Sequence, residues 1–329
     1  MSQAYDTLIP LIKKTGSRLS PKEFQEAVNV IFHDVEANYY DNLHQNMWQS
    51  LQEQINLLVD DLSGHDRYSS ASLSLLDIGC GTGLSTQLLL NSKLGNRIQR
   101  VTLLDTSPNM LKQAEIKSKR WNKEIHTINS DITGVSGKHD IILVCSVLHH
   151  IPDLKQFLSR IDQLQNSGAI FIHLQDPNGD YVHDAQYAGR VAEYAKQSSL
   201  SQIKRKLKGL VPDKVKNFIN KNFRSEPYID MVNDKLIREN IIVNRMTSAD
   251  IWSVTDIHSE HLPYSAQDGI SYKFLLETLV NYKPVSRRSY GFYGPLKSEL
   301  TLPFQNLEAN HIENRELNGR QISAVWMKK

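Results

Sequence analysis

The sequence predicts an α/β protein built on a doubly wound, mostly parallel sheet. Short apolar runs of strand length recur from residue 73 to residue 176, and helical patterns separate them. Strands that are apolar throughout and alternate with helices are typical of a parallel sheet covered on both faces. Residues 1–66 and 181–262 have helical patterns without a clear strand, so we expect helical additions to the sheet.

Composition excludes few classes of protein. The chain has 329 residues, and a hydrophobic share of 40% is ample for a packed core. A net charge of +2 gives no general argument for a nucleic-acid or membrane partner. Cys80 and Cys145 lie in apolar runs and read as buried, reduced thiols. We expect a cytoplasmic protein, because the sequence has neither a signal pattern nor about 18 consecutive apolar residues.

The N-terminal segment, residues 1–66, is expected to be a helical unit that helps to form a lid. Ser20 can cap a helix, Pro21 suits its first position, and Glu23 can complete a capping box. Helical spacing continues further along the segment. The apolar positions there are Met47, Leu51, Ile55 and Leu58.

The sheet core is expected at residues 67–180. Its predicted strands are 73–78, 101–105, 125–131, 140–147 and 168–176. A helical insertion over 181–262 would serve as a substrate lid. Residues 263–329 return to the core: a helix starts near Ser265, and two strands joined by a long polar loop end the chain.

A glycine-rich loop stands between the first predicted strand and its helix, in "LLDIGCGTG" at 75–83. Gly79, Gly81 and Gly83 allow a tight turn and close approach of a ligand, and the helix after them directs free N–H groups toward the loop. Asp105, at the end of the next strand, can bind both hydroxyls of a ribose. The pattern predicts a nucleoside-containing cofactor.

Details of the loop favour S-adenosylmethionine over NAD. The glycine spacing is GxGxG, whereas dinucleotide sites use GxGxxG. Asp77 precedes the first glycine, and no Lys or Arg occurs from 75 to 92. A carboxylate there would repel a phosphate but suits an amino group or a sulfonium.

Four motifs, "LLDIGCGTG", "LLDTSPNML", "INSDI" and "CSVLHHIPD", follow one another in this order. With them the chain resembles class I S-adenosylmethionine-dependent methyltransferases, strongly over 73–176 and weakly over 268–329. The resemblance implies a seven-stranded sheet, S-adenosylmethionine as cofactor, and a small-molecule or peptide methyl acceptor. It is specific for the cofactor and nearly silent on the substrate.

The resemblance also implies residue roles. Glycine-loop residues and the end of the fourth strand would lie under the methionine part, Asp105 would hold the ribose, and other residues would meet the adenine. The implied cofactor residues are Asp77, Gly79, Cys80, Gly81, Asp105, Thr106, Met110, Asp131, Ile132, Cys145, Ser146 and Tyr40. Ordinary packing explains Met110 and Tyr40 about as well, and it is favoured for the side chain of Cys145 though not for its backbone.

His149 and His150 are the catalytic candidates, because they follow the fourth strand where cofactor and acceptor should meet. Adjacent residues leaving a strand point in different directions, so at most one should face the acceptor, and His150 is favoured. Candidates for substrate contact are His173, Asp176, Tyr181, His258 and His261. We expect no metal site, because the HExxH order is absent and the sequence shows no ligand set around the histidine pair.

The acceptor stays open at this level. Methylation of an O or N atom of a metabolite comes first, a peptide, protein side chain or RNA second, and a non-catalytic cofactor-binding protein last. The basic stretch at 204–224 is either a solvated helical face or a site for an acidic partner. Few aromatics accompany it, which disfavours nucleic acid. The oligomeric state is not fixed, and a dimer through the N-terminal helices remains open.

Overall fold

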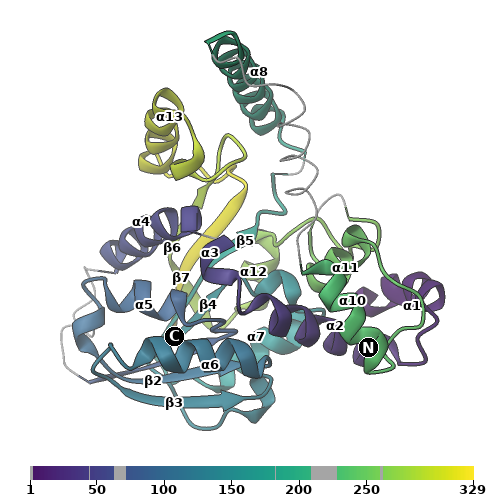
Figure 1. Cartoon of the computed structure of the whole chain (residues 1–329). Helices are drawn as coiled ribbons and strands as arrows, with labels where there is room; N and C mark the ends of the chain where they lie inside the picture. The colour runs from purple at the N-terminus through teal and green to yellow at the C-terminus, as the bar shows by residue number, and fades with distance from the viewer. Residues whose placement is uncertain (1–2, 44, 63–71, 182, 209–227, 260–261) are drawn as a thin grey trace.

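A seven-stranded sheet forms the centre of the molecule (Figure 1). The computed structural model describes residues 3–43, 45–62, 72–181, 183–208, 228–259 and 262–329. The strand order is β3-β2-β1-β4-β5-β7-β6, and β7 runs antiparallel to both of its neighbours. The strands are β1 (Leu73–Ile78), β2 (Ile98–Asp105), β3 (Glu124–Asn129), β4 (Ile141–Cys145), β5 (Ile170–Pro177), β6 (Tyr282–Tyr290) and β7 (Gln321–Lys328). The predicted fold class, a doubly wound and mostly parallel seven-stranded sheet, is confirmed.

Helices cover both faces of this sheet and extend beyond it. The described helices, with 3-10 helices written η, are η1 (Gln3–Leu8), α1 (Ile9–Thr15), α2 (Pro21–Glu36), α3 (Tyr40–Leu43), α4 (Gln45–Asp61), α5 (Leu84–Leu90), η3 (Gly95–Arg97), α6 (Pro108–Ser118), η4 (Ile132–Gly134), η5 (Leu148–His150), α7 (Leu154–Gln163), α8 (Ala185–Lys208), α10 (Ile229–Arg238), α11 (Ser248–Thr255), α12 (Tyr272–Thr278), η6 (Lys297–Glu299) and α13 (Leu302–Glu313). None of them is long and apolar enough to cross a membrane.

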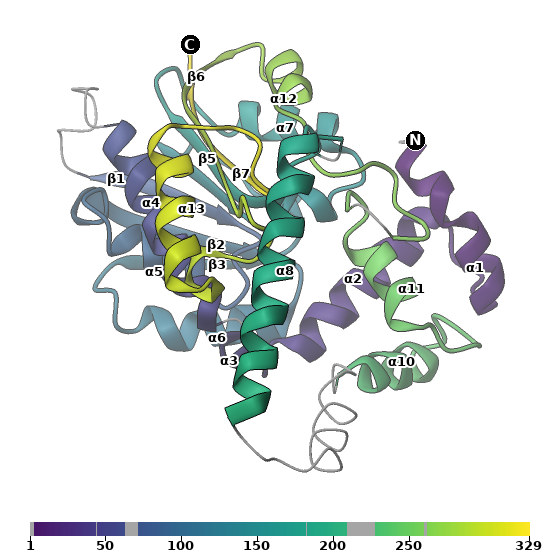
Figure 2. The same cartoon turned by 90° about the horizontal axis from the view of Figure 1, so that it is seen from above.

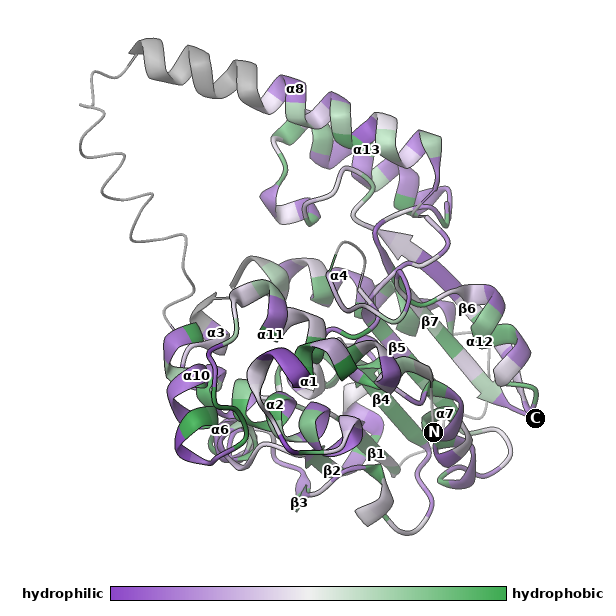
Figure 3. Ribbon diagram, turned by 90° about the vertical axis from the view of Figure 1, so that its right-hand side faces the viewer, coloured by the Kyte–Doolittle hydropathy of each residue, from purple (hydrophilic) through white to green (hydrophobic). Residues whose placement is uncertain are grey.

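Alternate residues of each central strand pack on opposite faces, because successive side chains in a strand point to opposite sides. Leu75 of β1 packs with α4, α5 and α6, whereas Leu76 packs with α7 and α12. Figure 3 shows hydrophobic residues along β4, which lies in the middle of the sheet. The edge strand β3 is largely exposed on both faces. The sheet therefore provides a rigid platform whose strand ends position the site.

Besides the apolar cores on the two faces of the sheet, a third apolar core joins the N-terminal helices to the end of the insertion. Phe32 of α2 meets Tyr228 and Trp252 edge-on, with ring centroids 5.6 and 5.0 Å away. Two ion pairs, Lys235 with Asp34 and Lys14 with Asp250, add to this packing. We call η1, α1, α2, α10 and α11 together the helical cap, which lies to one side of the sheet (Figure 2). The predicted capping box of Ser20 and Glu23 is confirmed at the start of α2.

The first helix of the insertion packs elsewhere. Tyr194 of α8 meets Phe304 of α13 edge-on at 5.0 Å, and Arg190 donates to the carbonyl oxygen of Phe292 at 3.2 Å. The segment between β6 and β7 is therefore not only a polar loop, since it contains α13 and a small apolar core. The predicted helix start at Ser265 is also wrong: α12 begins at Tyr272, and Ser271 caps it.

Candidate active site

A cavity of about 1050 Å³ opens at the carboxyl ends of β1, β2, β4 and β5. This is the edge at which open α/β sheets bind ligands, and the size suits a small-molecule site. Its walls come from the glycine loop, from the residues that follow β2, β3 and β4, from α2 and α11 of the cap, and from the segment between β6 and β7. Strand ends and the additions to the sheet thus both contribute to the cavity walls.

The glycine loop shapes one half of the cavity. Gly79, Gly81 and Gly83 have φ values of 64°, 53° and 78°, a region that side chains other than hydrogen rarely allow. A Cβ atom at Gly79 would lie 2.5 Å from the side chain of Val147. Asp105 accepts from the backbone N–H of Gly81 at 2.8 Å, which ties the loop to the end of β2. Burial raises the pKa of the Asp105 carboxyl.

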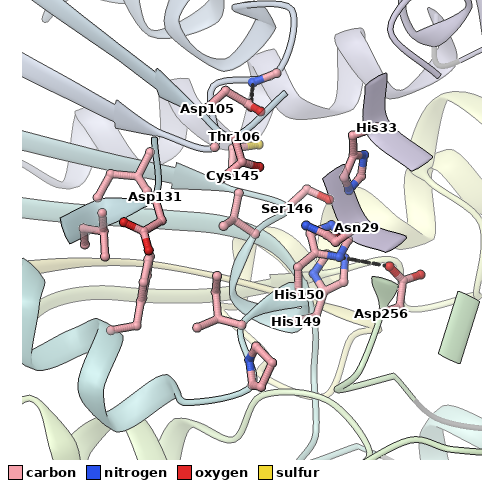
Figure 4. A pocket seen from close by; sticks show the side chains of 18 of the residues that line it. Asn29, His33, Asp105, Thr106, Asp131, Cys145, Ser146, His149, His150 and Asp256 are labelled. Carbon is pink, nitrogen blue, oxygen red and sulfur yellow. Dashed lines mark hydrogen bonds and ion pairs between the residues drawn. The ribbon is translucent and has the colours of Figure 1, made fainter. Parts of the chain in front are cut away.

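Most of the predicted cofactor residues line this cavity, and Figure 4 labels Asp105, Thr106, Asp131, Cys145 and Ser146 among the lining side chains. The predicted residues that line it are Tyr40, Gly79, Gly81, Asp105, Thr106, Met110, Asp131, Ile132, Cys145 and Ser146. Their individual roles stay predictions. Asp131 also caps η4, since its carboxylate accepts from the backbone N–H of Thr133 at 2.9 Å.

Asp77 and Cys80 lie behind the glycine loop, outside the cavity lining. Asp77 is fully buried and accepts hydrogen bonds from the hydroxyls of Ser85 and Thr86 at 2.7 and 2.6 Å. Burial raises its pKa to about 6. The Cys80 thiol is buried, and burial raises its pKa as well. In this structure the two side chains pack behind the glycine loop, on the side away from the cavity. The resemblance implied direct contact with the cofactor.

Two strained residues stand at neighbouring strand ends and line the cavity. Ser146 follows β4 with φ of 59°, and Gln175 near the end of β5 has φ of 65°. Non-glycine residues rarely take this conformation, and such strain concentrates at functional sites. The Gln175 side-chain carbonyl accepts from the hydroxyl of Tyr290 at 2.7 Å. Nothing in the sequence pattern pointed to Gln175.

Both histidines of the predicted pair line the cavity, and which of them faces the acceptor stays a prediction. Their rings are 4.0 Å apart. His149 Nδ1 lies 2.8 Å from Oδ1 of Asp176, which is fully buried. His150 Nδ1 lies 2.7 Å from the carbonyl oxygen of Thr255 and 3.1 Å from Asp256 Oδ1 (Figure 4). Each imidazole is therefore held by partners that fix its ring.

The helical cap completes this group with Asp256 and His33, which sequence reasoning did not assign to the site. Asp256 Oδ1 also lies 3.7 Å from His149 Nε2, and the His33 ring is 5.1 Å from the His150 ring. Burial alone would raise the pKa of Asp256, but its interaction with His150 outweighs burial and lowers it. The pKa of His150 is raised correspondingly, against the effect of its own burial. The expectation that no ligand set surrounds the histidine pair is wrong, because α11 brings Asp256 to it.

Of the remaining substrate candidates, those that the structure describes do not line the cavity. His173 is buried in the sheet, stacked at 6.4 Å on Trp326, and burial lowers its pKa to about 4. Tyr181 is buried against Tyr187. His258 is a structural link, since its Nε2 donates to the carbonyl oxygen of Ile151 at 2.9 Å. His261 lies outside the described residues, and Asp176 reaches the cavity only through His149.

Comparison with known proteins agrees with this arrangement. A family model described as a methyltransferase domain matches residues 76–171. Malonyl-[acyl-carrier protein] O-methyltransferase of Acetivibrio thermocellus is 29% identical over 115 residues, which are 35% of this chain and 38% of that protein. The highly reducing polyketide synthase aurA of Calcarisporium arbuscula is 26% identical over 160 residues, 46% of this chain and 6% of that protein. The chain thus spans well under two thirds of these relatives.

Among solved structures, the plantazolicin methyltransferase BpumL in complex with SAH covers 94% of this chain and 97% of its own, at 13% identity and a TM-score of 0.46. The matched methyltransferase domain, residues 76–171, contains the glycine loop, Asp105 and the histidine pair, and the seven-stranded sheet has the α/β methyltransferase fold. The match supports a class I S-adenosylmethionine-dependent methyltransferase with S-adenosylmethionine as cofactor.

Proposed function

We propose that this protein transfers a methyl group to an O or N atom of a small or medium-sized metabolite. One observation carries the proposal: a single cavity joins the glycine loop and Asp105 to the histidine pair. The helical cap covers this cavity, so an acceptor inside it would be shielded from water. A polymeric acceptor would instead favour an open groove.

The residues at the glycine loop fit the cofactor. The backbone at Gly79 lies where a Cβ would collide with Val147, and a Cβ at Gly81 would project toward the sulfur of Met110 at 4.0 Å. The half-buried carboxylate of Asp105 stands beside this cradle and suits a pair of ribose hydroxyls. Bound S-adenosylmethionine supplies an activated methyl group on a sulfonium centre, so positioning of the acceptor accounts for much of the rate.

The histidine pair is where we place the loss of the acceptor's proton. Because His149 Nδ1 faces the buried Asp176, its Nε2 is the nitrogen left for other partners, on the side of Asp256. A ring nitrogen fixed in this way accepts a proton or coordinates a cation. Either use suits an acceptor that arrives protonated, such as a hydroxyl or an ammonium group.

A protein-linked acceptor is the second candidate. The name of the malonyl-[acyl-carrier protein] O-methyltransferase relative specifies an oxygen acceptor on a carrier protein. The test is methyl transfer from labelled S-adenosylmethionine into cell extract that has been separated by size. Label in the low-molecular-mass fraction is the expected result. Label only in protein would favour the second candidate, and label in neither, with cofactor bound, would contradict both.

A further inference from the structure

We propose that His149, His150 and Asp256 form a binding site for a divalent transition-metal cation of the zinc type. The inference deepens the proposed function, on which it rests for the role of the ion: the ion would bind the acceptor's oxygen. The binding itself can be measured without any acceptor. Three ligand groups from two segments, the end of β4 and the end of α11, meet here (Figure 4).

The distances suit a shared ion. One ligand atom from each of the three residues lies within 4.8 Å of the others. Asp256 Oδ1 is 3.7 Å from His149 Nε2 and 3.1 Å from His150 Nδ1. Ligands bound about 2.1 Å from a zinc ion at tetrahedral angles are separated by about 3.4 Å. His149 Nε2 and Asp256 Oδ1 need only small movements to close on one ion, whereas His150 would first release the hydrogen bond that its Nδ1–H donates to the carbonyl oxygen of Thr255 at 2.7 Å.

The surroundings of His149 are those of a metal ligand. Metal-binding histidines usually donate their second ring N–H to a carboxylate or a backbone carbonyl, which fixes the ring and its tautomer. Asp176 takes this part, since it meets both Nδ1 and the backbone N–H of His149, at 2.8 and 3.2 Å. The backbone is held as well, because the carbonyl oxygen of His149 accepts from the N–H of His258 at 3.1 Å.

The charges around the site also favour a bound cation. Asp176 is fully buried and the Asp256 side chain is only 19% exposed. In the part of the chain that the structure describes, no Lys or Arg forms an ion pair with either carboxylate, and imidazoles are their only ionic partners. Buried carboxylates need a compensating charge, and a dication between them would supply it.

The helical cap places further side chains that could bind a metal ion beside the site. His33 of α2 faces the His150 ring at 5.1 Å, with its Nδ1 3.2 Å from Glu36. Asn29 Oδ1 is buried and has no hydrogen-bond partner among the described residues. Both residues line the cavity, so the ion would keep a position open toward an acceptor.

The donor set selects the kind of ion. Two imidazoles and one carboxylate suit Zn²⁺ or a similar transition metal, whereas Mg²⁺ and Ca²⁺ prefer oxygen ligands. An ion here would polarise a bound acceptor hydroxyl and lower its pKa. The hydroxyl's proton would then pass to water, and the oxygen would keep the electron pair that receives the methyl group.

The test uses the full chain after treatment with EDTA and dialysis. Calorimetric titration with ZnCl₂ should show one equivalent of tight binding, and Co²⁺ should give a visible absorption band; MgCl₂ should give neither. H149A and D256N should weaken zinc binding at least 100-fold, and D176N by about 10- to 100-fold. The control is H126A, because His126 forms an exposed pair with Glu124 at 2.9 Å on β3, away from the cavity. Its zinc titration should match that of the unaltered chain.

Absence of stoichiometric zinc binding would overturn the inference, as would equal binding by the unaltered chain and D256N. Each variant is first checked for its melting temperature and for S-adenosylmethionine binding, so that a folding defect is recognised. Methyl transfer that is equally fast with and without EDTA would also overturn the metal site. The proposed function would survive that result, with His149 taking the proton directly. Failure to bind S-adenosylmethionine or to transfer methyl under any condition would instead remove the proposed function.

Discussion

The two halves of the cavity are built differently. The half that we assign to the cofactor is lined mostly by one continuous part of the chain, between Gly79 and Ser146, with Tyr40 added from α3. The half that we propose for the acceptor is lined by side chains from η5, from α2 and from the end of α11, which the helical cap brings together. A fold that holds one cofactor in a constant way can therefore accept new substrates when the added helices change.

Removing His149 is the strongest test of whether the two halves of the cavity work separately. H149A should lower methyl transfer by about 10²- to 10⁴-fold, the usual loss when a group that handles a proton is removed. Affinity for S-adenosylmethionine should stay within about 3-fold, because His149 belongs to the acceptor half. Turnover and calorimetric cofactor binding would be measured on the same preparation. A large loss of cofactor affinity would show that the halves are not separate.

Lowering the pH should have the next largest effect, because it protonates the buried, neutral His173 and so lowers the stability of the fold. The pKa of His173 falls from 6.5 to about 4 on burial in the sheet. A histidine with a lowered folded pKa contributes stability that is full above pH 6.5 and is lost as pH falls toward 4. The loss is about 3 kcal/mol for His173, since each unit is worth about 1.4 kcal/mol.

Replacing His173 with Phe should remove that part of the acid sensitivity. His173 is flanked by Phe171 and Trp326 in the sheet, so an aromatic ring suits the position. Denaturant unfolding at pH 7 and at pH 4.5 would measure the change, with H126A as an exposed-histidine control. An unchanged difference between the two pH values would show that His173 does not titrate as its burial requires.

The cofactor half is tested by Asp105→Ala. Loss of a charge-assisted interaction with the ribose should weaken S-adenosylmethionine binding by roughly 10- to 100-fold, equivalent to about 1.5–3 kcal/mol. The variant also removes the bond to the N–H of Gly81, so D105N is the matched comparison. Calorimetry with each variant is the measurement. Unchanged affinity in both variants would contradict the assignment of Asp105 to the ribose.

This contrast also explains what could be predicted from sequence. Strand runs, the glycine loop and Asp105 depend on local patterns within one segment, so the sheet was predictable, and so was the placing of most of these residues at one cavity. Asp256 lies more than 100 residues from His150, and tertiary contacts bring them together: α11 packs on α2, and His258 is hydrogen-bonded to the backbone of His149 and Ile151. His258 and His173 are polar residues in suitable positions, but burial turns them toward the protein interior. Chemistry that depends on such packing leaves no local pattern to read.

The smallest expected effect concerns backbone strain where the halves meet. Ser146 has φ of 59° and lines the cavity. Glycine takes this conformation freely, so Ser146→Gly should relieve about 1 kcal/mol of strain, partly offset by the greater freedom of glycine in the unfolded chain. Denaturant unfolding should therefore show stability equal to or slightly above that of the unaltered chain. A clear loss of stability would mean that the serine side chain holds the end of β4 in place. The positions of the histidines that follow β4 would then depend on Ser146, and the two halves would be less independent than the packing indicates.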